Sequence, residues 1–250
     1  MSVLAVIPAR MGSTRLPRKN LLEIETGLTL LQQAIDSATG SGLVDEVVVS
    51  TDDKLLPIRN ARLRIRPAEI CGPTADISDA VYDAWQNTDL GVHDWVVTLQ
   101  PAVLARSQLI VRSMITECIS RQCSAITMAH TVPWIWQHSD QGGGMADVPW
   151  LRDGRYPRSQ DSAEHFAEVN AVTVAPASAV RKRCRWSLPL LIASLPSWAI
   201  ALDIDNPGDL VTARGLWPWA RRELETFTPR FHQVNDLSGF AEAAQGQLKV

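Results

Sequence analysis

Two clusters of ionisable side chains in this chain could together handle a phosphorylated ligand and a metal ion. The first is the loop formed by residues 7–20, which follows a short apolar run and carries four cations: Arg10, Arg15, Arg18 and Lys19. Small residues at positions 12–14 would let backbone N–H groups face a ligand. A loop of this kind after a strand is a typical phosphate site in an α/β sheet. A solvated basic loop explains the composition equally well, because Lys and Arg are usually exposed.

The second cluster is the acidic segment 203–209. Asp203 and Asp205 follow an apolar run at 199–202 that predicts a last strand. Residues two apart at a strand end point the same way, so both carboxylates could hold Mg²⁺, which takes oxygen ligands and bridges phosphates. Asp209 has another explanation, because it stands three positions after Asn206, a typical N-cap with Pro207 behind it. We therefore assign the metal to Asp203 and Asp205, and a helix cap to Asp209.

The elements that must position these clusters alternate between strands and helices. Thr29 and Gln32 form a capping-box pattern ahead of an apolar helical stripe, Ser78 is expected to cap a second helix, and a late helix should end at Pro218. Strands separated by helices favour parallel pairing, so we predict an α/β fold with a doubly wound, mostly parallel sheet. The strands are predicted at 3–7, 46–50, 95–99, 125–129, 169–175 and 199–202.

Residues 133–166 do not follow this alternation of strands and helices. They hold Trp134, Trp136 and Trp150 and three consecutive glycines, with almost no helical periodicity. Exposed aromatic residues are typical interface anchors, so the segment could be an arm that packs on a second subunit. A flap over the chain's own core explains it equally well. We divide the chain into a domain at 1–220, with 131–168 inserted as an arm, and an extension at 221–250 that we do not place.

Composition narrows the function classes. The net charge is −3 and the cations are local to one loop, which argues against a nucleic-acid partner. The most apolar run, 188–202, is too short for a bilayer and holds two prolines, so we expect no membrane partner. The four cysteines have no CxxC spacing, which favours reduced thiols in a cytoplasmic protein over a zinc site.

Taken in order, the motifs resemble those of the cytidylyltransferases that activate acidic sugars, the CMP–sialic acid and CMP–Kdo synthetases. The resemblance runs from Val3 to Trp217. Six segments carry it: residues 7–20 are similar to IPARGGSKRIPRKN, 48–52 to VVSTD, 66–69 to RPAEL, 99–101 to the start of LQPTSPLR, 157–161 to PRRQD, and 203–207 to DIDTP.

This resemblance implies a Rossmann-like nucleotidyltransferase fold similar to GT-A, with the arm forming a homodimer. It also implies that CTP and an acidic sugar are the substrates and Mg²⁺ the cofactor. The roles it implies are as follows: Arg10, Ser13, Arg15 and Lys19 hold the triphosphate; Asn20 and Arg66 lie near the nucleoside; Asp203 and Asp205 hold Mg²⁺; Gln100, Arg158 and Gln160 face the sugar; and Arg10, Lys19 and Asp205 act in catalysis.

The implied reaction is attack of the anomeric hydroxyl of a sialic-acid-like ulosonic acid on the α-phosphorus of CTP, with release of pyrophosphate. Such a transfer needs alignment of the reactants and neutralisation of developing charge.

The chain departs from the family at several positions. Thr14 replaces a lysine, Ala102 and Val103 replace two hydroxyl residues expected near the sugar, and Asn170 replaces a glycine. These changes suggest a different acceptor, or a non-catalytic nucleotide-binding relative. A sugar-nucleotide glycosyltransferase is a third possibility, but its DxD motif should follow a middle strand and this one comes late.

Overall fold

The computed structural model describes the chain except for residues 73, 89–93, 132–136, 139–144, 147–163 and 237–250. The strands within the described residues are β1 (Val3–Pro8), β2 (Glu23–Glu25), β3 (Leu28–Thr29), β4 (Glu46–Thr51), β5 (Arg62–Ile65), β6 (Trp95–Leu99), β7 (Ser124–Thr131), β8 (Gln137–His138), β9 (Met145–Ala146), β10 (His165–Pro176), β11 (Leu190–Leu195) and β12 (Arg230–Val234). The helices are α1 (Leu30–Gly40), α2 (Ile77–Gln86), α3 (Gln108–Arg121), α4 (Ala177–Val180) and α5 (Pro207–Thr226), with 3₁₀ turns η1 (Lys19–Leu21), η2 (Ala68–Ile70) and η4 (Ser197–Leu202).

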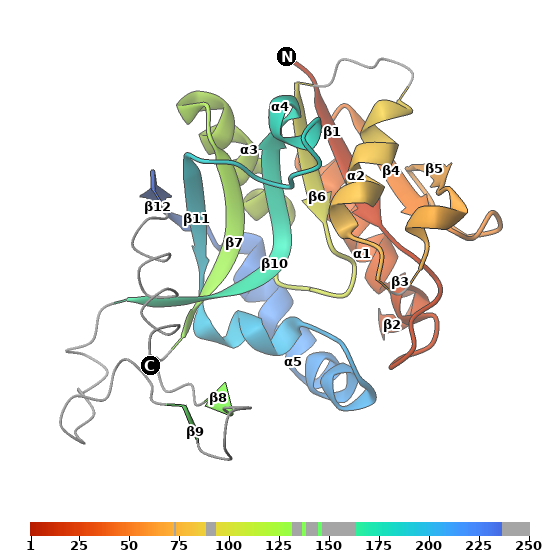
Figure 1. The fold of residues 1–250 in the computed structure, drawn as a ribbon. Coiled ribbons are helices and arrows are strands. Elements are labelled where there is room, and N and C mark those ends of the chain that lie inside the picture. Colours follow the sequence, from red (N-terminus) through yellow and green to blue (C-terminus); the bar gives the residue numbers. More distant parts are fainter. Residues whose placement is uncertain (73, 89–93, 132–136, 139–144, 147–163, 237–250) are drawn as a thin grey trace.

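Eight of the strands form one central sheet, in the order β12-β11-β7-β10-β6-β1-β4-β5 (Figure 1). Four of its seven neighbouring pairs are parallel: β1–β4, β1–β6, β4–β5 and β7–β11. β10 lies antiparallel between β6 and β7, and β12 is antiparallel to β11. The predicted mostly parallel α/β sheet is confirmed.

Helices cover both faces of this sheet. Alternate residues of β1 point to opposite sides, so Val3, Ala5 and Ile7 join the larger core with α1, α3 and α5. Leu4 and Val6 join the smaller core on the other face, beneath α2 and α4. A strand buried on both faces explains why the sequence at this point is a continuous apolar run.

Of the two helix N-caps predicted at Thr29 and Ser78, the structure confirms the first and not the second. Thr29 is the N-cap of α1, because its side chain accepts a hydrogen bond from the Gln32 N–H. The expected cap of α2 at Ser78 is wrong, since the Asp76 carboxylate takes that place and accepts from the Ser78 N–H. This bond holds the pKa of Asp76 below its usual range.

The strand expected at 199–202 is also wrong. These residues belong to η4, and the preceding strand is β11. Ala199 and Leu202 are the buried residues of η4. Their spacing of three matches the 3₁₀ period rather than the strand period of two. Asp203 therefore follows a 3₁₀ helix and not a strand.

The late helix does not end at Pro218, as its sequence had indicated. Proline inside a helix costs about 3 kcal/mol because it removes a hydrogen bond. α5 nevertheless continues to Thr226, and Ala220 and Leu224 extend the buried stripe that Leu210, Ala213 and Trp217 begin. Burial of these side chains offsets the penalty.

The described part of the expected extension at 221–250 completes α5 and then forms β12 at the edge of the main sheet. Most of the expected arm at 131–168 lies outside the described residues, including Trp134, Trp136 and Trp150. Of the arm, the structure describes the ends that belong to β7 and β10 and a small pair, β8 with β9. The homodimer therefore stays a prediction. Within the described residues, no helix combines the length and apolar character that a bilayer crossing requires.

Candidate nucleotide and metal site

Three neighbouring parallel strands, β6, β1 and β4, end at the same edge of the sheet. The loop after β1 carries the predicted cations. It is fastened to the end of β4 by two hydrogen bonds: the Ala9 N–H donates to the Ser50 carbonyl at 2.8 Å, and the Met11 N–H donates to the Asp52 carboxylate at 2.8 Å. The loop therefore leaves the sheet in a fixed direction.

Asn20 closes the same loop from its far end. Its side chain is buried, and its Nδ2 donates to the Arg10 carbonyl at 3.0 Å. The Arg10 guanidinium in turn donates to the Gly72 carbonyl at 2.7 Å. Asn20 thus holds the loop's shape, while Ser13 lies partly exposed within it.

The cation loop contacts the acidic segment directly. Lys19 Nζ lies 2.9 Å from one Asp205 carboxylate oxygen, and Arg15 Nη2 lies 2.9 Å from the other. The hydrogen bond from Lys19, together with the positive charges of Lys19 and Arg15, holds the pKa of Asp205 below its usual range. The fold therefore unites two clusters that are nearly 190 residues apart in sequence.

Asp203 has a different environment from Asp205. Within the described residues, its carboxylate accepts no hydrogen bond from a side chain or a backbone N–H. Burial, which removes water from the carboxylate, raises the pKa of Asp203, and the negative charge of Asp205 raises it further. A divalent cation bound here would relieve both effects.

The position of Asp203 is set by the segment after β6 rather than by a strand end. Asp203 forms a bridge with Val103. On either side of it, the Leu104 N–H donates to the Leu202 carbonyl and the Ile204 N–H donates to the Ala102 carbonyl, both at 3.0 Å. The segment 100–106 and the acidic segment thus run together as a short antiparallel pair.

Asp209 is a helix cap, as predicted. Its Oδ2 accepts from the Asp205 and Asn206 N–H groups, and the Asn206 side chain accepts from the Gly208 and Asp209 N–H groups. This reciprocal capping box fixes the start of α5 immediately after Asp205.

The residues present fit Mg²⁺. This ion is usually held by one or two carboxylates together with substrate phosphates and water, so it does not need a closed protein cage. The described residues contain no cluster of three His, Cys, Asp or Glu side chains able to hold a metal. Asp203 and Asp205 are two carboxylates on one short segment, which is what a shared metal–phosphate site requires.

The remaining predicted residues lie at different depths. Arg66 is buried, and its guanidinium donates to the Ser50 hydroxyl at 2.9 Å and to the Ser50 carbonyl at 2.8 Å, so it supports the end of β4. Burial lowers the pKa of Arg66. Gln100 lies partly exposed just past β6. Arg158 and Gln160 lie outside the described residues.

Two residues of this region were missed by the sequence interpretation. Asp52 belongs to the motif at 48–52, and its position after β4 indicates a loop anchor. Arg106 is fully buried and binds carbonyls of the segment that pairs with the backbone around Asp203. The signal available for Arg106 was an arginine close after the motif at 99–101.

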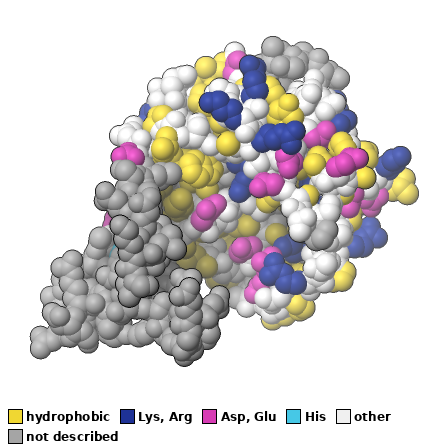
Figure 2. Space-filling view, viewed as in Figure 1, with side chains coloured by type: hydrophobic (Ala, Val, Ile, Leu, Met, Phe, Trp, Pro, Cys, Tyr) yellow, Lys and Arg dark blue, Asp and Glu magenta, His cyan; other side chains and the backbone are white. Residues whose placement is uncertain are grey.

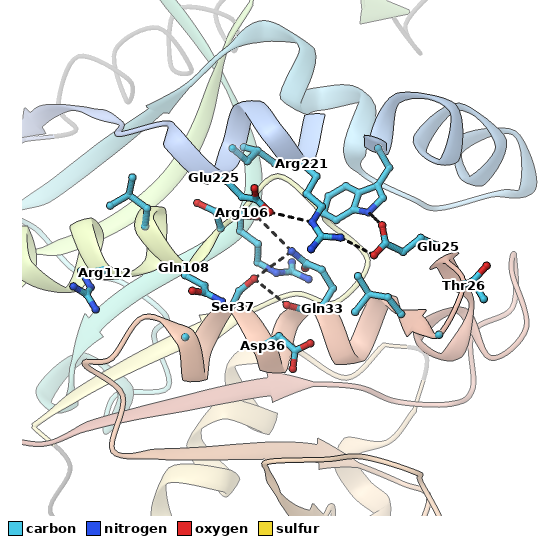
Figure 3. Close-up of a pocket in the computed structure, with 17 residues that line it drawn as sticks. Glu25, Thr26, Gln33, Asp36, Ser37, Arg106, Gln108, Arg112, Arg221 and Glu225 are labelled. Atoms are coloured by element: carbon cyan, nitrogen blue, oxygen red, sulfur yellow. Dashed lines mark hydrogen bonds and ion pairs between the residues drawn. The ribbon is translucent and has the colours of Figure 1, made fainter. Parts of the chain in front are cut away.

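A cavity of about 600 Å³ lies apart from this site, between α1, α3, α5 and the β2–β3 hairpin (Figure 3). Its cations are already engaged: Arg221 pairs with Glu25 and Glu225, and Arg112 donates to the Ser41 carbonyl. On the face that Figure 2 shows, Lys and Arg side chains lie among Asp and Glu side chains. The contact between Lys19 and Asp205 therefore identifies the site better than cavity size or surface charge.

A family model described as cytidylyltransferase matches residues 4–101. The resemblance indicated by the motifs is therefore confirmed over this part of the chain.

Two relatives and one solved structure extend this comparison. The pseudaminic acid cytidylyltransferase of Campylobacter jejuni is 48% identical over 54 residues, which is 22% of this chain and 23% of the relative. The 3-deoxy-manno-octulosonate cytidylyltransferase of Erwinia tasmaniensis is 27% identical over 207 residues, covering 74% of this chain and 80% of the relative. The structure of a CMP:2-keto-3-deoxy-manno-octonic acid synthetase complexed with CTP matches 88% of this chain and 99% of its own, with a TM-score of 0.63 and 18% identity. At this identity the structural match shows the fold.

Proposed function

We propose that the chain is a CTP-dependent cytidylyltransferase that transfers CMP to the anomeric hydroxyl of an ulosonic acid of the sialic-acid type and releases pyrophosphate. The observation that carries this proposal is the contact of Lys19 and Arg15 with Asp205. This contact joins the cation-rich loop after β1 to the short segment that carries Asp203 and Asp205, which supports a shared site for phosphates and a metal. The cytidylyltransferase match over residues 4–101 covers the loop half of this arrangement.

The cations of the loop have two roles in this proposal. Without nucleotide, Lys19 and Arg15 bind Asp205 and stay oriented toward the site. When CTP binds, its phosphate oxygens take these donors, together with Arg10 and the loop N–H groups. Cations aimed at the transferring phosphoryl group neutralise the charge that develops there, and removal of one such stabiliser usually costs on the order of 10²–10³ in rate.

The carboxylates serve the metal. Asp203 and Asp205 would hold Mg²⁺, which would neutralise the triphosphate and orient it for in-line displacement. Asp205 would be free to hold the metal once the phosphates bind Lys19 and Arg15. Among the described residues Asp203 has no such partner to release, so its carboxylate is available for the metal.

Gln100 and the Arg158–Gln160 segment are the residues expected to contact the acceptor sugar. The change at Val103 should affect acceptor binding little, because Val103 is only 3% exposed and packs in the core. Its lost hydroxyl is therefore at a position that faces away from solvent. Ala102, which is partly exposed, remains the change that favours a different acid or a non-catalytic nucleotide-binding relative.

The test is turnover with CTP, Mg²⁺ and a panel of eight- and nine-carbon ulosonic acids, followed by pyrophosphate release. The expected result is release with at least one acid and loss of that release in Asp205→Asn. Asp79→Asn is the matched control, because Asp79 also pairs with an arginine, Arg183 at 2.7 Å, but on α2.

Two outcomes would contradict the proposal in different ways. CTP binding without pyrophosphate from any acid in the panel would favour the non-catalytic nucleotide-binding relative. An absence of CTP binding, measured by calorimetry with Mg²⁺ present, would reject a nucleotide site at this sheet edge.

A further inference from the structure

Arg106 is the largest fully buried side chain in the described part of the chain, at 1% exposure. A buried guanidinium is normally paired with a carboxylate, because an unpaired buried charge is costly. Arg106 has no carboxylate partner among the described residues. Burial lowers its pKa to about 9, which leaves the side chain charged at neutral pH.

Backbone carbonyls take the place of the missing carboxylate. Arg106 Nη1 donates to the carbonyls of Gln100, at 2.6 Å, and of Val103, and Nη2 donates to the carbonyl of Pro101 at 3.3 Å. Its Nε has no hydrogen-bond partner within the part of the chain that the structure describes. One side chain thus binds three carbonyls of the turn formed by residues 100–106 and holds that turn around itself.

The turn that Arg106 holds is the one that positions the acidic segment. Its residues Ala102 and Leu104 exchange backbone hydrogen bonds with Ile204 and Leu202, on either side of Asp203. Gln100, the expected acceptor contact, is the first residue of the same turn. A shift of this turn would therefore move Asp203 and Gln100 together.

We propose that Arg106 is a positioning residue for the reaction: it fixes the 100–106 turn, and through the turn it sets the positions of Asp203 and Gln100 relative to the cation loop. This inference rests on the proposed function for its kinetic consequence. Its structural consequence, order in two backbone segments far apart in sequence, does not depend on that function.

Arg112 supplies a matched control. It lies on α3, which begins two residues after Arg106; it also binds a backbone carbonyl, donating to Ser41 at 2.6 Å, and it lines the same cavity. Its target is the turn between α1 and β4, which lies at the opposite end of β4 from the site. A general loss of packing should affect both arginines, whereas loss of site geometry should appear only at Arg106.

The first measurement is backbone hydrogen exchange of Arg106→Lys and Arg112→Lys without substrates. A lysine has one donor group where arginine has a planar fork, so it cannot bind all three carbonyls in the same geometry. Loss of protection at the amides of Leu104 and Ile204 in Arg106→Lys, and not in Arg112→Lys, is the expected result. Unchanged protection there, or an equal loss across the sheet, would overturn the inference.

The second measurement is steady-state turnover with CTP. A displacement of about 1 Å at a reacting centre costs on the order of 10²-fold in rate. We therefore expect kcat of Arg106→Ala to fall by about that factor, while KM for CTP changes by less than about threefold, because the loop cations are untouched. Arg112→Ala should keep kcat near the wild-type value. Equal kcat losses in the two variants would also overturn the inference.

The cavity provides a rescue experiment. Arg106 lies in its wall beside Gln33, whose amide donates to the Arg106 carbonyl (Figure 3). Free guanidinium at millimolar concentration should enter the space left in Arg106→Ala and raise kcat severalfold, with no effect on wild type or Arg112→Ala. If Arg106→Ala does not fold by circular dichroism, Arg106→Lys gives the kinetic comparison. If wild type itself does not turn over CTP, the proposed function fails, while hydrogen exchange still decides the inference.

Discussion

Replacing Asp203 or Asp205 by asparagine should shift the stability of the unliganded protein in opposite directions. Asp205→Asn removes the carboxylate that binds Lys19 and Arg15. Asp203→Asn removes a carboxylate that accepts no hydrogen bond within the described residues and that lies near the charge of Asp205. The two side chains keep nearly the same shape in both variants, so charge and hydrogen bonding are what change.

The magnitudes follow from exposure. The Arg15 side chain is 68% exposed, so its pair with Asp205 adds close to nothing. Lys19 is 16% exposed and Asp205 40%, so this pair should be worth about 1 kcal/mol, the upper end for partly exposed pairs. Loss of 1 kcal/mol lowers Tm by about 2–4 °C in a chain of this size. Asp203→Asn should raise Tm by about 1 °C or less, since it removes the cost of burying a charged carboxylate and a screened repulsion from Asp205.

The stability changes caused by Asp203→Asn and Asp205→Asn should also depend on pH in different ways. The pKa of Asp205 is lowered in the folded state, so its contribution to stability is present above the unfolded value of about 3.9 and is lost as pH falls through the lower folded pKa. The pKa of Asp203 is raised, so its contribution is present below about 3.9 and is lost as pH rises through the higher folded pKa. The Asp205→Asn difference should therefore disappear in acid, and the Asp203→Asn gain should appear toward neutral pH.

The assay is differential scanning calorimetry at several pH values without nucleotide or metal, and again with Mg²⁺ and CTP. Asp79→Asn, which breaks another aspartate–arginine pair, reports what loss of an ordinary surface pair does. Both site variants should lose the additional stabilisation that Mg²⁺ gives together with CTP. A Tm of Asp205→Asn at or above wild type at pH 7 without ligands would refute the ion-pair interpretation, as would shifts of the same sign in both variants.

Three further substitutions test other parts of the argument. Asn20→Ala removes the partly buried hydrogen bond that closes the loop, worth about 1 kcal/mol, so KM for CTP should rise about fivefold with a smaller change in kcat; an unchanged KM would contradict this. Arg66→Met should lower the free energy of unfolding in urea by about 1–3 kcal/mol, because two buried hydrogen bonds to Ser50 are lost. A loss below about 0.5 kcal/mol would mean that Arg66 does not support β4. Asn170 has a φ of 56°, in the left-handed region. Asn170→Ala should therefore lower the free energy of unfolding in urea by about 1 kcal/mol, while Asn170→Gly should stay within about 0.5 kcal/mol of wild type. Equal effects of the two substitutions would exclude backbone strain as the cause.

The left-handed conformation of Asn170 also explains a departure from the family pattern. The family has glycine at this position, and the structure shows a shift of register in the β10–β7 pairing between Glu168 and Thr173. Asparagine is the non-glycine residue that tolerates such a conformation best. Asparagine at this position is therefore compatible with the register shift in β10.

Several features of the fold could be predicted because their causes are local. The apolar runs at β1, β4 and β6 indicate strands buried on both faces, and Asn206–Asp209 indicates a capping box whatever surrounds it. The helix that continues through Pro218 could not be predicted in this way, because its stability comes from side chains buried against the rest of the protein. The 3₁₀ turn before Asp203 was missed because a short apolar run fits a strand equally well.

The sequence by itself determined which groups could do the chemistry: a cation-rich loop after the first strand, and two aspartates ahead of a capped helix. Their types and spacing follow from local rules, and the motif order connects them to a family. Only the tertiary structure decided that Lys19 and Arg15 meet Asp205, that Asp203 is held by the 100–106 turn, and that Arg106 holds that turn from within the core. The physical reason is that these contacts join residues up to 190 positions apart, and the distance between them is set by how the strands pair and the helices pack.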